Sequence, residues 1–190
     1  MTYTKNMTKL SNREIKYIVI HYTAGVTSKK GSAVNTANYF NKDTTKASSD
    51  FIVDDETVVQ YNNDIKNQYT WHAGDSKMNK QSIGIEICSN NKTGKMTVPN
   101  DPNYYFTEES LTNAVELVKK LMKEYNIPIE NVIRHYDVTH KLCPGILGWT
   151  DSKAPEWNKF KERLSDKPQI DIKATIQTII KSLQDLLDVL

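Results

Sequence analysis

Residues 134–145, RHYDVTHKLCPG, gather several side chains that can bind a metal or attack a bond. His135, His140 and Cys143 offer imidazole nitrogens and a thiol, and Lys141 adds a positive charge. Three interpretations suit such a segment: a metal site, a thiol nucleophile with its base, or a crowded polar turn. The residues that fold beside it must decide between them.

A catalytic zinc site needs three protein ligands and one open position. Imidazoles and a thiolate are suitable donors, and His135 and Cys143 provide one of each. His21 ends the first predicted strand, so an adjacent strand can bring it to this pair. A structural zinc site is less favoured, because such sites usually close with four ligands and Cys88 is the only other cysteine. The spacing alone also suits ordinary core and loop residues.

Glu86 and Lys141 add the parts that hydrolysis of an amide needs. In the segment QSIGIEICS, three isoleucines alternate with Gly84, Glu86 and Cys88, which places a carboxylate on the working face of a strand. Such a carboxylate can take a proton from an attacking water and pass it to a leaving amine. Lys141, close to Cys143 in the sequence, would lie beside the metal and stabilise the oxyanion of a tetrahedral intermediate.

The rest of the sequence predicts the elements that position these residues. β-branched and aromatic runs predict strands, and apolar residues at helical spacing predict helices. Thr107 suits the N-cap of a long amphipathic helix. Strands that alternate with helices predict an α/β fold with a mixed central β-sheet flanked by helices. The expected strands are 16–24, 49–62 (a hairpin), 81–89 and 129–137, the expected helices are 31–42, 108–125 and one from Pro155, and a polar loop is expected over 90–106.

Composition and charge exclude several classes of protein. The 190 residues suffice for one domain with a sizeable core, and two cysteines do not build a disulfide framework. A net charge of +2 gives no reason to expect a nucleic-acid partner. No apolar run approaches the roughly 20 residues that span a bilayer. Residues 1–16 lack the apolar core of a secretory signal, so we expect a chain made in the cytoplasm without a signal peptide or transmembrane segment.

From residue 168 the composition changes to that of an amphipathic helix with heptad-like spacing. Apolar residues recur at a and d positions, namely Ile172, Ile176, Ile179, Leu183, Leu186 and Leu190. We therefore divide the chain into a catalytic domain, residues 1–167, and a C-terminal amphipathic helix, residues 168–190. This helix is expected to pack back on the domain, to mediate self-association or partner docking through 172–190, or to begin a linker.

Four segments together resemble one known enzyme family: YIVIHYT, WHAGDS, SIGIEI and RHYDVTHKLCPG. They look like the zinc-dependent N-acetylmuramoyl-L-alanine amidases of the type-2 class, which share their fold with peptidoglycan recognition proteins and are common among bacteriophage endolysins. The resemblance covers roughly residues 14–165, and the four segments are specific as a set. It implies the peptidoglycan recognition protein fold and hydrolysis of the amide bond between N-acetylmuramic acid and L-alanine in bacterial peptidoglycan, which lyses the cell wall.

The resemblance also implies roles for individual residues. Glu86 matches the catalytic glutamate, and Lys141 matches the lysine beside the metal. His72, in TWHAG, matches a position that lines the substrate groove, and we assign it a substrate contact, with ordering of its own loop as the alternative. The ligands of one Zn²⁺ per chain would be His21, His135 and Cys143.

Some residues depart from the family pattern or have no role in it. Some members of the fold carry a tyrosine near the zinc, just before the strand that here reads DFIVD. This chain has Ser49 and Asp50 there, which leaves Glu86 as the candidate base. We expect His140 to be an exposed loop residue and Cys88 a buried, inert thiol. The missing export signal favours a phage or prophage lysin, released when a holin opens the membrane, over a host autolysin.

Two other functions stay open from the sequence. Cys143 could be the nucleophile of a cysteine peptidase of the cell wall, with His135 as its base. Against this, Pro144 lacks the N–H that an oxyanion hole often uses beside a nucleophile. The chain could instead be a non-catalytic peptidoglycan-binding module. Relatives of that kind have typically lost the cysteine ligand, which is present here.

Overall fold

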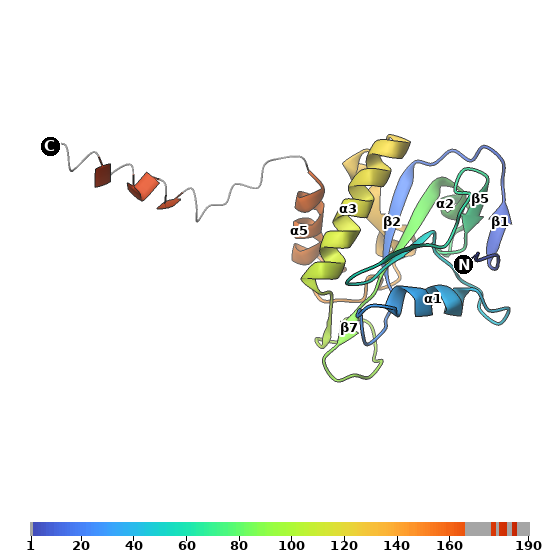
Figure 1. Cartoon of the computed structure of the whole chain (residues 1–190), viewed down its shortest axis with the longest axis horizontal. Helices are drawn as coiled ribbons and strands as arrows, with labels where there is room; N and C mark the ends of the chain where they lie inside the picture. Colours follow the sequence, from blue (N-terminus) through green and yellow to red (C-terminus); the bar gives the residue numbers. More distant parts are fainter. Residues whose placement is uncertain (1, 166–175, 178, 182–183, 186–190) are drawn as a thin grey trace.

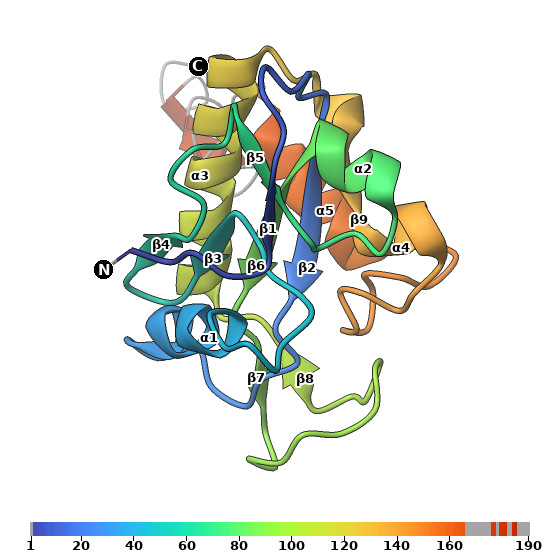
Figure 2. The same ribbon diagram turned by 90° about the vertical axis from the view of Figure 1, so that its right-hand side faces the viewer.

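A mixed sheet of five strands lies at the centre of the computed structural model, which describes residues 2–165, 176–177, 179–181 and 184–185. The strands are β2 (Tyr17–Tyr22), β3 (Phe51–Val53), β4 (Val58–Gln60), β6 (Ser82–Ile87) and β9 (Val132–Arg134). They lie in the order β4–β3–β6–β2–β9 (Figure 2). All pairings are parallel except that of β4 with β3. The predicted α/β fold with a mixed central sheet is therefore confirmed.

Helices and short strand pairs surround this sheet. The helices are α1 (Ser32–Phe40), α2 (Ser76–Gln81), α3 (Glu108–Tyr125), α4 (His135–Thr139) and α5 (Pro155–Leu164), and η1 (Ile129–Asn131) is a 3₁₀ turn. Two antiparallel pairs lie outside the central sheet: β1 (Met7–Lys9) with β5 (Gln68–Thr70), and β7 (Asn90–Asn91) with β8 (Tyr104–Tyr105).

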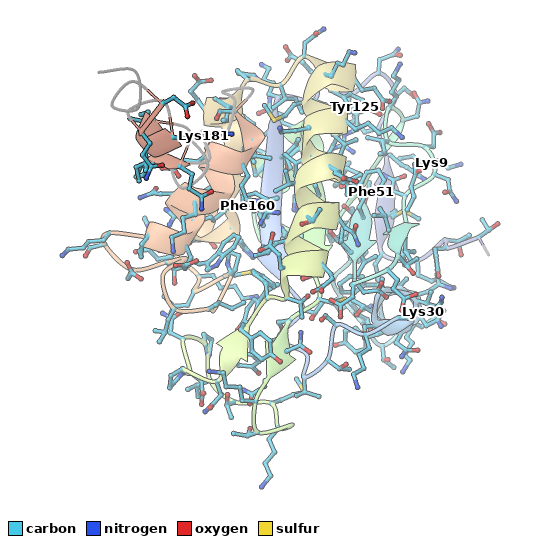
Figure 3. All side chains as sticks on the ribbon, turned by 60° about the vertical axis from the view of Figure 1, so that its left-hand side comes forward. Lys9, Lys30, Phe51, Tyr125, Phe160 and Lys181 are labelled. Atoms are coloured by element: carbon cyan, nitrogen blue, oxygen red, sulfur yellow. The ribbon has the colours of Figure 1, made fainter. Side chains whose placement is uncertain are left out.

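Alternation along the strands gives the sheet two different faces. The isoleucines of β6 lie in the larger core, which also holds Val118 of α3 and Phe160 of α5. α3 and α5 lie side by side over this face (Figures 1 and 3), and burial of each such side chain stabilises the fold by about 1.5–3 kcal/mol. The other face packs on α1 through a smaller core that includes Ala37 and Cys88. Glu86 alternates with the isoleucines, so it faces the α1 side.

The long helix begins and ends where the sequence predicts. α3 follows Thr107, whose side chain accepts a hydrogen bond from the backbone N–H of Ser110 (3.2 Å), as an N-cap does. The other predicted helices, over 31–42 and from Pro155, are present as α1 and α5. The strands predicted over 16–24 and 81–89 are β2 and β6, and the hairpin predicted over 49–62 is β3 with β4.

Residues 129–137 were wrongly predicted as one strand. η1 precedes the short strand β9, and α4 begins directly at His135. Asp137 closes the first turn of α4, because its Oδ2 accepts a hydrogen bond from the backbone N–H of Arg134 (2.8 Å). The polar loop predicted over 90–106 contains β7 and β8. These short elements, like β1, β5 and α2, have too few residues to show a period in the sequence.

The predicted C-terminal helix lies largely outside the described residues. Within the described part, residues 176–177, 179–181 and 184–185 are helical, and Ile176, Ile179 and Ile180 are about half exposed. The boundary at residue 168 and the self-association through 172–190 stay predictions. Among the residues that the structure describes, no helix is both long and apolar enough to cross a membrane.

Candidate metal centre and active site

The ends of three neighbouring strands place His21, Glu86 and His135 in one row. His21 on β2 is the register partner of Glu86 on β6. On the other side, Ile20 is the partner of Arg134, the last residue of β9, so His135 follows beside His21. The three strands are parallel, and the carboxyl ends of parallel strands form the usual binding edge of such a sheet. The sheet itself therefore brings together residues that are distant in the sequence.

Cys143 completes a cluster of three buried metal-binding side chains. One potential ligand atom from each of His21, His135 and Cys143 lies within 4.8 Å of the other two. Nδ1 of His21 is 3.7 Å from Sγ of Cys143, and the rings of His21 and His135 are 4.8 Å apart between centroids. Two imidazoles and one thiol that converge beside a cavity fit a catalytic zinc site, which uses three protein ligands and leaves one position open.

A cavity of about 670 Å³ opens onto this cluster. Its lining includes Asn35 and Tyr39 of α1, Met96 and Pro99, and residues 141–143. Glu86 and Lys141 line the same cavity as the cluster, and Lys141 is exposed to solvent. The structure thus brings the predicted ligands, the predicted carboxylate and the predicted cation to one cavity.

Burial keeps the potential ligands uncharged. It lowers the pKa of His135 to about 4 and the pKa of His21 well below its usual value, so both rings have a free lone pair at neutral pH. Burial raises the pKa of the Cys143 thiol to about 12, against a smaller opposing effect of a backbone hydrogen bond from Tyr22. A bound cation would deprotonate this thiol. A catalytic cysteine nucleophile needs the opposite shift, so these surroundings disfavour a cysteine peptidase.

Glu86 has the environment of a group that exchanges protons. Its Oε2 is buried and has no hydrogen-bond partner among the described residues. Burial raises the pKa of Glu86 to about 8, although the charge of Lys141 acts in the opposite direction. A carboxyl group with a pKa near neutrality can both accept and release a proton at working pH. A buried oxygen without a partner also leaves room for a hydrogen bond to a water molecule or a substrate group.

His72 lines the same cavity, and its ring contacts that of His21. Nδ1 of His72 is 3.0 Å from Nε2 of His21, and Nε2 of His72 is 3.2 Å from Oγ of Ser82. The ring is 7% exposed and packs on Gly84, where a Cβ atom would lie 2.5 Å from Cγ of His72. Both ring nitrogens therefore have protein partners. The substrate contact of His72 stays a prediction.

The other residues considered in the sequence lie outside the group of candidate metal ligands. Asp50, at the position where some members of the fold carry tyrosine, is buried and accepts a hydrogen bond from the backbone N–H of Gly84 (2.8 Å). Neighbouring Ser49 is also buried. His140 is exposed, as expected. Cys88 is 1% exposed and burial raises the pKa of its thiol, which agrees with an inert cysteine.

The sequence alone did not indicate the residues that hold His72. Oδ1 of Asn79 accepts hydrogen bonds from the backbone N–H groups of His72 (3.1 Å) and Ala73 (2.7 Å), and Ser82 contacts the His72 ring. Gly84 was the available signal. It lies inside β6, and a glycine inside a strand often marks the close approach of another group.

Comparison with known proteins extends over the same region. A family profile described as N-acetylmuramoyl-L-alanine amidase matches residues 11–146, which include every candidate site residue. The N-acetylmuramoyl-L-alanine amidases CwlH and XlyA of Bacillus subtilis (strain 168) are 36% identical over 152 residues and 35% identical over 147 residues. These alignments cover 78% and 76% of this chain but 52% and 42% of the two relatives. The chain thus spans about half the length of these relatives, or less.

Solved structures of similar proteins share the fold. A mutant endolysin from Bacillus subtilis has a TM-score of 0.63 at 30% identity, over 86% of this chain and 96% of that chain. The catalytic domain of XlyA has a TM-score of 0.61 at 31% identity, over 82% of this chain and 93% of that chain. The similarity in structure therefore covers most of both chains.

Proposed function

Because the chain belongs to the N-acetylmuramoyl-L-alanine amidase family, we propose that it hydrolyses the amide bond between N-acetylmuramic acid and L-alanine in bacterial peptidoglycan. One observation carries this proposal: three buried metal-binding side chains converge on a cavity that a partly buried carboxylate also lines. The metal we propose is one Zn²⁺ per chain, held by His21, His135 and Cys143. This donor set suits zinc, and the neutral imidazoles are ready to bind it.

Zinc supplies Lewis acidity at such a site, which polarises the scissile carbonyl and makes a water molecule more acidic. Glu86 has the place and the proton affinity of the general base. In its ionised form, which a cation bound nearby would favour, it takes a proton from the attacking water and then gives that proton to the amine of the departing L-alanine. One carboxyl group therefore serves both proton transfers of the hydrolysis.

Lys141 provides the positive charge for the tetrahedral intermediate. It lines the cavity together with Cys143 and Glu86 and is exposed to solvent, and its ammonium group would face the developing oxyanion. A charge that is already in place stabilises the oxyanion more than the neutral carbonyl, which lowers the barrier. The lining residues of α1 and of the segment with Met96 and Pro99 would contact the glycan and the stem peptide around the bond.

The two rival functions are less well supported by this site. A peptidase nucleophile needs an accessible thiolate, whereas Cys143 is 4% exposed and its thiol has a raised pKa. A module that only binds the wall does not need a complete set of ligands with a carboxyl group beside it. The observed set therefore favours hydrolysis over binding alone.

We place the activity at the bacterial cell wall, where the substrate is. A role as a phage or prophage endolysin is part of this proposal, and the name of the mutant endolysin from Bacillus subtilis agrees with it. Release through a holin stays a prediction.

The deciding experiment measures new L-alanine amino termini released from purified cell walls. The complete chain is tested as isolated, after treatment with a chelator, and after zinc is returned. We expect amino termini that appear, disappear and appear again. Solubilised walls without new L-alanine termini would mean that another bond is cut. Sedimentation with walls and no release under any condition would favour the binding module.

A further inference from the structure

We propose that His72 is a positioning residue that determines which nitrogen of His21 faces the metal site. This role presupposes the zinc site proposed above, but it does not presuppose a substrate. It follows from a series of hydrogen bonds that begins at a backbone carbonyl in α2 and ends at His21.

The protons in this series can be placed one after another. Oγ of Ser82 donates its single proton to the backbone carbonyl of Met78 (2.6 Å), so toward His72 it can only accept. Nε2 of His72, 3.2 Å away, must therefore carry the proton of that ring. A neutral imidazole has one N–H, so Nδ1 of His72 is an acceptor. Its partner, Nε2 of His21 at 3.0 Å, must then be the donor.

The result is a defined tautomer of His21. With its proton on Nε2, the ring presents a bare lone pair on Nδ1. Nδ1 is also the His21 atom that lies 3.7 Å from Sγ of Cys143, on the side of the metal cluster. The hydrogen bonds that start at the carbonyl of Met78 therefore leave Nδ1 of His21 unprotonated, and Nδ1 is the atom on the side of the metal cluster.

The surroundings of His72 hold its ring in this orientation. Asn79 fixes the backbone of His72, because its Oδ1 accepts hydrogen bonds from the backbone N–H groups of His72 and of the next residue, Ala73. The missing side chain of Gly84 leaves the space in which the ring lies. His72, Asn79 and Ser82 are all buried, so the assembly is part of the protein interior. Outer partners of this kind typically contribute a factor of about 10–100 to metal affinity.

Substitution of His72 tests this role through zinc affinity. We expect His72→Ala to weaken zinc binding about 10–100-fold in competition with a chromophoric chelator. His72→Asn should recover most of that loss, because its Oδ1 can accept from Nε2 of His21. The matched control is His140→Ala, which removes an exposed histidine and should bind zinc like the wild type. Unchanged zinc affinity in His72→Ala, together with a raised KM for wall fragments, would make His72 a substrate contact and overturn the proposal.

A measurement on the unsubstituted protein does not depend on whether a variant folds. Nitrogen-15 NMR of the histidine-labelled chain, without and with zinc, reports the state of each ring nitrogen. We expect His72 to carry its proton on Nε2 in both samples, and His21 to bind zinc through Nδ1 while Nε2 stays protonated. A proton on Nδ1 of His72, or zinc on Nε2 of His21, would contradict the proposal. Neither result depends on wall hydrolysis, so a failure of the amidase assay would be separately visible.

Discussion

His21 and Glu86 are register partners on two adjacent parallel strands. Their side chains therefore leave the same face of the sheet, one strand spacing (about 4.8 Å) apart. A proposed metal ligand and the proposed base are thus held by the backbone hydrogen bonds of β2 and β6 rather than by a loop. Such support limits the movement of the carboxyl group relative to the metal site, as precise proton transfer requires.

Replacement of Glu86 separates proton transfer from metal binding. We expect Glu86→Gln to keep zinc but to lower kcat for release of L-alanine termini by at least about 100-fold, because the amide cannot accept the proton of the attacking water. Glu116→Gln on the exposed side of α3 is the matched control and should retain wild-type kcat. A Glu86→Gln enzyme with near-normal kcat would require another base.

Replacement of Lys141 tests the oxyanion role. Lys141→Ala should lower kcat on the order of 100-fold and change KM less, because the charge acts mainly on the transition state. Zinc affinity should not decrease, since removal of a nearby positive charge does not disfavour a cation. Lys120→Ala, which removes an exposed lysine of α3, serves as the control. A loss confined to KM would instead make Lys141 a binding residue.

The sequence predicted the reactive side chains of this site better than the residues that hold them in position. His21, Glu86, His135 and Cys143 could be named because their side chains carry chemistry and lie at strand ends or in a marked turn. The α/β fold and the long helix followed from periodicity, which residues 108–125 show over several turns. That these four side chains lie close together could be predicted only from the resemblance of the motifs, because the pairing of β2 with both β6 and β9 joins residues distant in the sequence.

Two features could not be predicted from the sequence, because each depends on single side-chain contacts. The sequence favours a strand where α4 begins, because the capping of the first turn of α4 by Asp137 depends on one side chain and leaves no periodic pattern. The place of His72 was equally hidden, since its partners Ser82 and Gly84 look like ordinary residues of a strand. The structure shows that the hydroxyl of Ser82 donates to the carbonyl of Met78, and this sets the direction of the following hydrogen bonds.

Loss of Cys143 should separate wall binding from wall cleavage. We expect Cys143→Ala to lose zinc and to release no L-alanine termini, while it still sediments with purified walls through the unchanged cavity walls. Cys88→Ala is the control for loss of a buried thiol, and it should keep zinc and activity. Cleavage by Cys143→Ala at the wild-type rate would show that the ligand assignment is wrong.

The pH dependence of stability should reveal the buried carboxyl group in the zinc-free protein. Burial raises the pKa of Glu86 to about 8, so between pH 6.5 and 8 the unfolded chain has released this proton while the folded chain retains it. The contribution of Glu86 to the free energy of unfolding should therefore fall with rising pH, by roughly 2 kcal/mol over this interval.

His135 acts in the other direction and at lower pH. Because burial lowers its pKa to about 4, its contribution to stability is lost mainly as the pH falls from about 6.5 to 4, and only the upper end of this titration reaches the higher interval. Burial also lowers the pKa of His21 and of His72, so these two residues act in the same direction, and comparison with a Glu86 variant cancels the effect of all three histidines. Denaturant unfolding of zinc-free wild type and Glu86→Gln at several pH values tests this. Relative to the wild type, the free energy of unfolding of Glu86→Gln should rise by roughly 2 kcal/mol between pH 6.5 and 8, whereas that of Glu116→Gln should stay parallel to the wild type. Equal slopes in all three proteins would mean that Glu86 is ionised in the folded state.

A methyl group at position 84 should weaken the metal site without touching a ligand. The Cβ atom of Gly84→Ala would lie 2.5 Å from Cγ of His72, which is closer than two non-bonded carbon atoms can approach. The imidazole ring of His72 must therefore move. We expect zinc affinity to fall about 10-fold or more, as in His72→Ala, measured by the same chelator competition. The double variant Gly84→Ala/His72→Ala is the control, because the clash disappears with the ring. Its affinity should equal that of His72→Ala alone, and fully additive losses would mean that the methyl group acts on the zinc site by another route.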